Sequence, residues 1–387
     1  MKVNTRAPLL REVNTLPHLV HVMAKRLTAA VTAVFPATLC QSINRVFITG
    51  CGDSHHAAIA AELAFEQLAG LPCEPMTAMQ MARYAAGFLP DGGSLVMGVS
   101  VSGQASRTVE AVNMARQVGA TAVAVTGNSK SPLAQTTQLI LETAVPPLPD
   151  ELQGLIVPGV RSYIISQLAL FLTAVHLGQR RGHLPPTRAN QVRHQLVSTA
   201  AKMTQTISNC GPICQQMAER WSDADQFHFC GAGPNYATAM FNAAKILEAS
   251  GDTAVAQDTE EWAHLQYFSR QVDTPTFFIS NGGWDASRVL EVAAAAKQIG
   301  RRVVLIAPEN STLARTAVHD ILLPISGKSR ECFSPLLTCL PGILFAAYRA
   351  HVVGESYFRG FGGGRSAEGG GGISRIRTSR QINRPHR

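Results

Sequence analysis

The chain has 387 residues, of which 46% are hydrophobic and 16% are charged. This composition excludes a disordered or fibrous protein and is sufficient for two domains with buried cores. The formal net charge is +8, and most of the excess lies in a glycine- and arginine-rich tail, so we expect this tail to fold over an anionic substrate or a neighbouring subunit rather than to bind nucleic acid.

No segment has the pattern of a secretory leader or a membrane anchor. The first 17 residues lack a continuous apolar stretch, and the most apolar run, Leu336 to Val353, is broken by Pro341 and carries Arg349 and His351. The eight cysteines are scattered and form neither a disulfide framework nor a paired zinc pattern. We therefore expect a cytoplasmic protein with no membrane contact, no metal and no cofactor.

From Arg45 onward, short β-branched runs alternate with longer helical patterns, which is typical of βαβ units and a parallel sheet. In the first half we expect strands at 46–49, 95–99 and 122–126, and helices at 55–68 and 106–118. In the second half we expect strands at 227–230, 276–279 and 303–307, and helices at 234–249 and 285–299. Helical patterns at 16–34, 162–177, 190–220 and 335–353 flank these two series.

The two halves also match residue by residue at a nearly constant offset. The pair of glycines in 50–52 corresponds to the pair in 231–233, Ser100 to Ser280, and Gly119 to Gly300. Such an offset indicates duplication of one α/β domain. We expect a helical segment at 1–44, a first domain at 45–183, a second at 184–355 and a tail at 356–387, with the boundary in the glycine and proline cluster Gly182 to Thr187.

Two loops of the first half suit an anionic ligand. The loop from Gly50 to His55 joins a strand to a helix, where backbone N–H groups and the helix dipole attract anions. It is not the dinucleotide fingerprint, because His55 replaces the third glycine; Glu74 lies about where a ribose-binding acid would, which leaves a nicotinamide site open. The alternative is a tight turn without a ligand.

The second loop runs from Ser100 to Ser106 and offers three hydroxyl groups together with Gly103. Hydroxyl and amide groups suit a phosphate that must be bound and released. One of these serines could instead cap the following helix, but capping does not explain all three.

These loops resemble those of the sugar isomerase (SIS) domain family, and the resemblance covers roughly Arg45 to Gly354 in the family's double-domain arrangement. It is strongest to the isomerase half of glutamine–fructose-6-phosphate aminotransferase and to related fructosamine-phosphate deglycases and deaminases. It implies an α/β fold with two tandem doubly wound parallel-sheet domains, each a three-layer αβα structure. It also implies that a sugar phosphate is bound by Cys51, Gly52, Ser54, Ser100, Ser102, Gly103 and Ser106, with Val160 and Ser162 lining the sugar site. Ala105 stands where the family usually has a phosphate-binding threonine, and Ser106 could substitute for it.

The catalytic resemblance lies in the second half. The segment 244–248 resembles the family helix that supplies Lys245 and a general base, Glu248, and the segment 260–264 resembles an element whose histidine, His264, enters the site from the partner subunit. Proton transfer between sugar carbons needs a carboxylate whose pKa is raised by partial burial, and histidine can give and take a proton near neutral pH. The alternative is that Glu248 with Lys245, and Glu261 with His264, are surface ion pairs.

Two absences narrow the expected reaction. The chain begins almost directly with the first sugar domain, so we expect no glutamine-hydrolysing domain, and no lysine follows Lys328, whereas the aminotransferase relatives carry a ring-opening lysine in their tail. We expect an isomerising deaminase or deglycase that acts on an amino-sugar or fructosamine 6-phosphate as a homodimer or higher even oligomer. The alternatives are an aldose–ketose phosphosugar isomerase and a non-catalytic sugar-phosphate-binding regulator.

Overall fold

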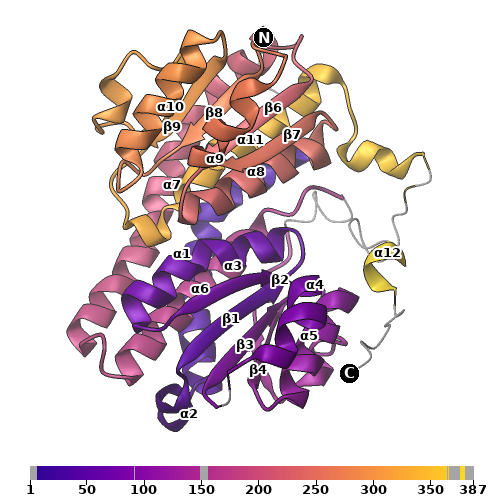
Figure 1. The fold of residues 1–387 in the computed structure, drawn as a ribbon, viewed down its shortest axis with the longest axis vertical. Helices are drawn as coiled ribbons and strands as arrows, with labels where there is room; N and C mark the ends of the chain where they lie inside the picture. Colours follow the sequence, from indigo (N-terminus) through magenta and orange to yellow (C-terminus); the bar gives the residue numbers. More distant parts are fainter. Residues whose placement is uncertain (1–6, 91, 149–155, 364, 366–374, 380–387) are drawn as a thin grey trace. The chain divides into compact units, whose positions relative to one another are not determined.

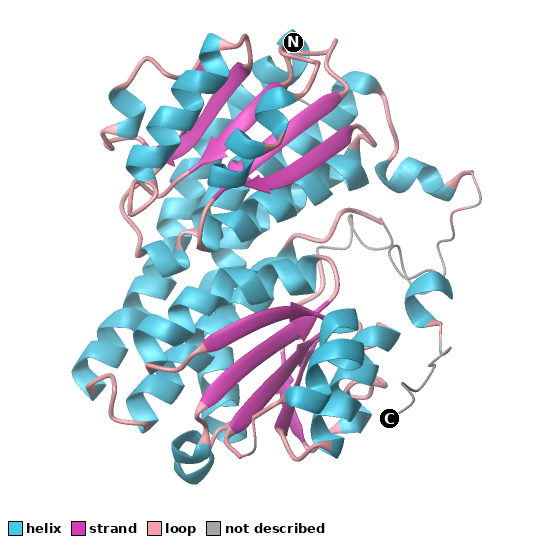
Figure 2. Cartoon of the chain, in the orientation of Figure 1, coloured by secondary structure: helices cyan, strands magenta, loops and turns pink. Residues whose placement is uncertain are grey.

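The computed structural model describes residues 7–90, 92–148, 156–363, 365 and 375–379. The chain forms two compact units, each with one five-stranded sheet (Figures 1 and 2). The first-sheet unit contains the described residues of Leu19–Pro147 and Arg161–Val197, together with those from Phe361 onward. The second-sheet unit contains the described residues up to His18 and those of Leu148–Val160 and Ser198–Gly360.

The first sheet is parallel, with the order β2-β1-β3-β4-β5. Helices α3 and α6 pack against each other on one face, and α5 covers the other face (Figure 1). The bounds are β1 Arg45–Gly50, α3 Asp53–Ala64, β2 Cys73–Thr77, α4 Ala78–Gln80, β3 Ser94–Val99, α5 Ser106–Gln117, β4 Thr121–Thr126, β5 Leu139–Glu142 and α6 Arg161–Arg180, with π-helical turns η1 Phe65–Ala69 and η2 Met81–Ala85.

The second sheet is also parallel and has the order β10-β9-β8-β6-β7. When the strands of each sheet are counted from its own first strand, both sheets have the order 2-1-3-4-5. The bounds are β6 Gln226–Gly231, α8 Pro234–Ala249, β7 Thr253–Asp258, α9 Thr259–His264, β8 Pro275–Ile279, α10 Ala286–Gln298, β9 Arg302–Pro308, β10 Ile321–Ile325 and α11 Pro335–Val353. The remaining helices are α1 Pro8–Val34, α2 Ala37–Ser42, α7 Pro186–Arg220 and α12 Arg375–Thr378.

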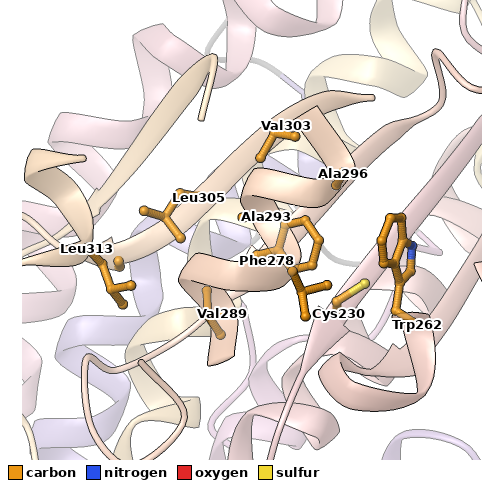
Figure 3. Packing of buried hydrophobic residues seen from close by; sticks show 11 residues of the cluster. Cys230, Trp262, Phe278, Val289, Ala293, Ala296, Val303, Leu305 and Leu313 are labelled. Atoms are coloured by element: carbon orange, nitrogen blue, oxygen red, sulfur yellow. The ribbon is translucent and has the colours of Figure 1, made fainter. Parts of the chain in front are cut away.

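Helices cover both faces of the second sheet as well. Figure 3 shows the core between α10 and the strands, where Trp262 of α9 lies near Phe278 and Cys230. Helices α8 and α11 pack together on the opposite face. Apolar residues on both faces of each central strand explain why these strands read as continuous hydrophobic runs.

The predicted α/β fold with two parallel sheets is confirmed. The three predicted strands of each half are the inner strands of its sheet, and the helix predicted at 234–249 has the bounds of α8. The predicted boundary at Gly182 to Thr187 covers the turn between α6 and α7, but α7 continues across residues 197 and 198, where the two units meet in the sequence. The compact units therefore interleave along the chain, unlike the contiguous ranges that we expected.

Pro341 does not interrupt the apolar run as expected, because α11 continues through it. This helix is the one described helix long and apolar enough to cross a membrane, and 78% of its most apolar window is buried in the protein. It packs on α8, and the Cys214 thiol donates to the Pro341 carbonyl at 3.4 Å. These contacts identify α11 as a core helix of the second-sheet unit.

Candidate functional site

The first loop is a tight turn between β1 and α3. Gly52 has φ 54°, and its carbonyl accepts the N–H groups of His55 at 2.9 Å and His56 at 3.0 Å. A Cβ atom on Gly50 would lie 2.8 Å from the Ser54 Cβ, so this position has no room for a side chain. Cys51 and Gly52 are exposed and Ser54 is partly exposed, which leaves the turn accessible to a ligand.

The second half forms the same turn between β6 and α8. Gly233 has φ 52°, and a Cβ atom on Gly231 would lie 2.2 Å from the Asn235 carbonyl oxygen. The backbone geometry alone therefore requires the glycines of both turns. Any anion specificity of the first loop must come from its side chains and from the start of α3.

The predicted site did not include Asp53 and His55, two titratable residues of the first loop. Asp53 begins α3, and its carboxylate lies 3.5 Å from the His56 Nδ1. Burial, and to a lesser extent the His56 charge, lowers the pKa of His55 to about 4, so this imidazole is neutral at physiological pH. The Asp53 carboxylate repels a bound anion unless the His56 ring compensates its charge. The spacing of residues in the sequence does not by itself single out an aspartate or a histidine at this loop.

The second loop presents hydroxyl groups at the start of α5. Ser100 is buried, whereas Ser102 and Ser106 are partly exposed, and the Ser102 Oγ accepts the N–H of Gln104 at 3.3 Å. Gly103 has φ +66°, and a Cβ atom there would lie 1.9 Å from the Ser131 Oγ. The loop thus presents accessible hydroxyls beside the positive end of a 12-residue helix.

The corresponding loop of the second half has different chemistry. Ser280 donates its hydroxyl to Asp285 at 2.6 Å, and the Glu331 carboxylate accepts the N–H of Trp284 at 3.4 Å. Burial is the main cause that raises the pKa of Asp285 to about 6, so this carboxyl group is mostly charged at neutral pH. Two carboxylates at this loop disfavour a phosphate.

Lys245 and Glu248 form an ion pair one turn apart on α8. The Lys245 side chain is fully buried, whereas 26% of the Glu248 side chain is exposed. The Lys245 Nζ donates to the Glu248 Oε2 and, at 3.4 Å, to the Gly159 carbonyl, and it lies 4.8 Å from the Phe241 ring centroid. The interpretation of this pair as a surface ion pair is therefore wrong.

His264 lies at the end of α9, with 63% of its side chain exposed. Its Nε2 is 3.0 Å from Glu260, and Arg288 holds the same carboxylate at 2.5 Å. The partner of His264 is therefore Glu260 and not Glu261. Helix α8, which carries Glu248, precedes β7 in the chain, and helix α9, which carries His264, follows β7.

A family model described as "SIS domain" matches residues 40–177, and those residues contain the first sheet and both hydroxyl-bearing loops. Residues 40–177 of the chain therefore contain a SIS domain. Among curated relatives, it is 26% identical over 312 residues to glutamine–fructose-6-phosphate aminotransferase (isomerizing) of Gloeobacter violaceus, covering 81% of this chain and 50% of that protein. It spans about half the length of the curated relatives it matches.

Solved structures share the fold of this SIS protein over most of its length. The C-terminal domain of glucosamine-fructose-6-phosphate aminotransferase from Francisella tularensis has a TM-score of 0.79 at 19% identity, covering 92% of this chain and 98% of that chain. Glucosamine-6-phosphate deaminase from Thermotoga maritima has a TM-score of 0.66 at 18% identity, covering 90% and 96%. At these identities the likeness establishes the fold.

The predicted site residues of the SIS protein lie in both units. The first-sheet unit holds both loops and the partly exposed Ser162, whereas the second-sheet unit holds Lys245, Glu248, His264 and the fully buried Val160. Lys245 and Glu248 are in direct contact, and Gly159, next to Val160, contacts Lys245. Glu74 lies within the edge strand β2, before its carboxyl end, which is not where a ribose-binding acid would be placed.

Proposed function

We propose that this SIS protein is a phosphosugar-processing enzyme, an isomerising deaminase or deglycase that acts on an amino-sugar or fructosamine 6-phosphate. The observation that carries the proposal is the contact of Glu248, a partly exposed carboxylate, with the fully buried Lys245 ammonium. Burial of a charged lysine is costly, so its presence beside an accessible carboxylate favours a chemical role over a surface ion pair. The names of the relatives, a glutamine–fructose-6-phosphate aminotransferase and a glucosamine-6-phosphate deaminase, support the substrate class.

In this proposal the two loops bind the phosphate, through Ser54 in the first and through Ser100, Ser102 and Ser106 in the second. Glu248 takes the proton from the sugar carbon beside the carbonyl or imine group. The adjacent Lys245 ammonium balances the negative charge of the Glu248 carboxylate. Lys245 also holds Glu248 in one rotamer and offsets the negative charge that develops on the substrate.

We assign to His264 the transfer of a proton to the departing nitrogen. Its exposure on α9 suits a group that acts on a ligand outside its own core, and we propose that it acts from the partner subunit of a homodimer. An aldose–ketose isomerase would use the same base without the C–N cleavage, so reaction products distinguish the two activities. A non-catalytic regulator would have no use for the buried Lys245–Glu248 pair.

The test is an assay of the purified protein with a panel of 6-phosphorylated amino sugars, fructosyl amino acids and fructose. Release of ammonia or amine supports the deaminase or deglycase, whereas aldose–ketose conversion without amine release supports the isomerase. Calorimetric titration with hexose 6-phosphates that shows no binding would contradict every one of these functions.

The substitution Glu248→Gln tests the base. The glutamine carbonyl can still accept the Lys245 hydrogen bond, so we expect the unfolding free energy to fall by about 1–2 kcal/mol and turnover to fall about 10²- to 10⁴-fold. Glu219→Gln makes the same change at an exposed position of α7 and should keep full activity. Full turnover by E248Q on every active substrate would show that Glu248 is not the base.

A further inference from the structure

The carboxyl end of α8 is completed by a residue from the C-terminal segment of the chain. The last carbonyl groups of a helix have no partner within the helix. Here the Ile246 carbonyl accepts the N–H groups of Ser250 at 3.0 Å and Gly251 at 3.1 Å, and the Glu248 carbonyl accepts the Arg359 Nη2 at 2.5 Å. Arg359 therefore binds the backbone of the proposed base.

The Arg359 guanidinium occupies space that only a glycine leaves open. Gly251 has φ +81°, and a Cβ atom there would lie 2.1 Å from the Arg359 Nη1. Any other residue at 251 would strain the backbone and displace the guanidinium. The conformation of Gly251 and the position of Arg359 thus depend on each other.

The segment that carries Arg359 has an unusual backbone. In η9, Tyr357–Phe361, the non-glycine residues Phe358 and Arg359 have φ 54° and 56°. Left-handed backbone is unfavourable for such residues and persists where the surroundings fix it. Tyr357 is one anchor, because it hydrogen-bonds the backbone of Leu9 in α1 and its burial raises its pKa.

We propose that Arg359 is a positioning residue for Glu248. A cation that binds the last carbonyl groups of a helix offsets the negative end of the helix dipole and fixes the last turn. The last turn of α8 carries the Glu248 carboxylate and holds it against Lys245. This inference rests on the proposed role of Glu248 as the base, and it gives this arginine a backbone ligand in place of the anionic substrate or neighbouring subunit that we expected the tail to cover.

The experiment compares Arg359→Ala, Arg359→Lys and the wild type by hydrogen exchange and by kinetics. For R359A we expect exchange at the Ser250 and Gly251 amides to accelerate about 10-fold, and kcat to fall about 10-fold with KM nearly unchanged. R359K should restore part of both, because an ammonium can donate to the same carbonyl. Arg220→Ala removes an exposed arginine at the end of α7 in the same unit as the control and should match the wild type.

Gly251→Ala tests the same contact from the other side. Its Cβ should displace the guanidinium and lower kcat, and the R359A/G251A double variant should lose much less than the product of the two single losses, because both changes remove one interaction. Unchanged exchange in R359A, or faster exchange with unchanged kcat, overturns the inference. If the wild type turns over no substrate of the panel, the proposed function fails, and exchange at the end of α8 alone decides whether Arg359 fixes this turn.

Discussion

A lysine side chain with no solvent exposure has few stable environments. Lys245 contacts the Glu248 carboxylate, the Gly159 carbonyl and the face of the Phe241 ring. Together they replace the water that the ammonium loses on burial. Glu248 keeps partial exposure, so water can reach its carboxylate when the lysine is removed, and this asymmetry makes the pair accessible to mutation.

Lys245→Met separates the structural role of this lysine from its chemical role. Methionine fills a similar volume but leaves the partly exposed Glu248 carboxylate without its counter-charge, so we expect the unfolding free energy in urea to fall, by less than the ~3–5 kcal/mol that is lost when one partner of a fully buried pair is removed. Turnover should fall about 10²-fold because Glu248 loses the group that orients it. Wild-type turnover in K245M would limit Lys245 to packing.

At the scale of single residues, the sequence identified candidate residues but not their burial or their contacts. Lys245 and Glu248 were found through the family motif, yet a spacing of three residues is the same on a buried and on an exposed helix face. The Glu260 partner of His264 could not be chosen over Glu261, since both lie within one turn. The contact of Arg359 with α8 could not be predicted from the sequence, because its partner is a backbone carbonyl 111 residues away.

At the scale of elements, corresponding loops of the two halves have different chemistry. The loop before α5 presents hydroxyl groups, and its counterpart before α10 contains Asp285 and lies against Glu331. The two loops also differ in backbone, because Gly103, three residues after Ser100, has φ 66°, whereas Gly282, two residues after Ser280, has φ 71°. A phosphate should therefore distinguish the two loops.

Hydrogen exchange with and without fructose 6-phosphate tests this difference. We expect protection of residues 100–108 and no change at 280–288, because carboxylates repel the phosphate at the second loop. Ser102→Ala should reduce the protection, and Ser287→Ala, at the start of α10, should not. Equal protection of both loops would contradict the assignment of the phosphate to the first half.

The inner strands of both sheets were predictable because they are buried on both faces. The edge strands β2, β5, β7 and β10 were not, since they are short and partly exposed and contain residues such as Glu74 and Pro324 that are rare in strands. Helices α1, α7 and α11 each continue through an internal proline. Packing can offset the cost of a missing N–H, which no local rule anticipates.

At the scale of the whole molecule, Glu62 should link stability to pH. Burial, followed by the charges of Glu66 and Glu74, raises the pKa of Glu62 to about 7 from an ordinary value of 4.5. Because the pKa of Glu62 is raised in the folded state, its contribution to the free energy of unfolding is fully present below about pH 4.5 and is lost as the pH rises through 7.

Glu62→Gln should remove this dependence. A shift of this size corresponds to about 3 kcal/mol, which partial exposure reduces to about 1 kcal/mol. We expect the Tm of E62Q to exceed that of the wild type by about 2–4 °C at pH 8 and to equal it at pH 4.5. E219Q is the control, and a wild-type pH profile in E62Q would show that Glu62 does not ionise in this range.

The existence of two α/β units followed from the repeated pattern, but their composition did not. Pattern analysis assigns contiguous ranges, whereas residues up to His18 belong with the second sheet and α7 continues from one unit into the other. Long-range packing decides to which unit a segment belongs, and this packing leaves no periodic pattern in the local sequence.

The hydrogen bond between Arg359 and the end of α8 joins two segments that the ribosome synthesises at different times. The ribosome makes the proposed base 111 residues before it makes the arginine that caps it. A chain cut between the end of α11 at Val353 and Arg359, by a premature stop codon or a protease, would keep both sheets' inner strands and every residue proposed for chemistry, and would still lack the arginine that fixes the last turn of α8. Such a fragment would fold and would turn over its substrate about 10-fold more slowly than the full chain.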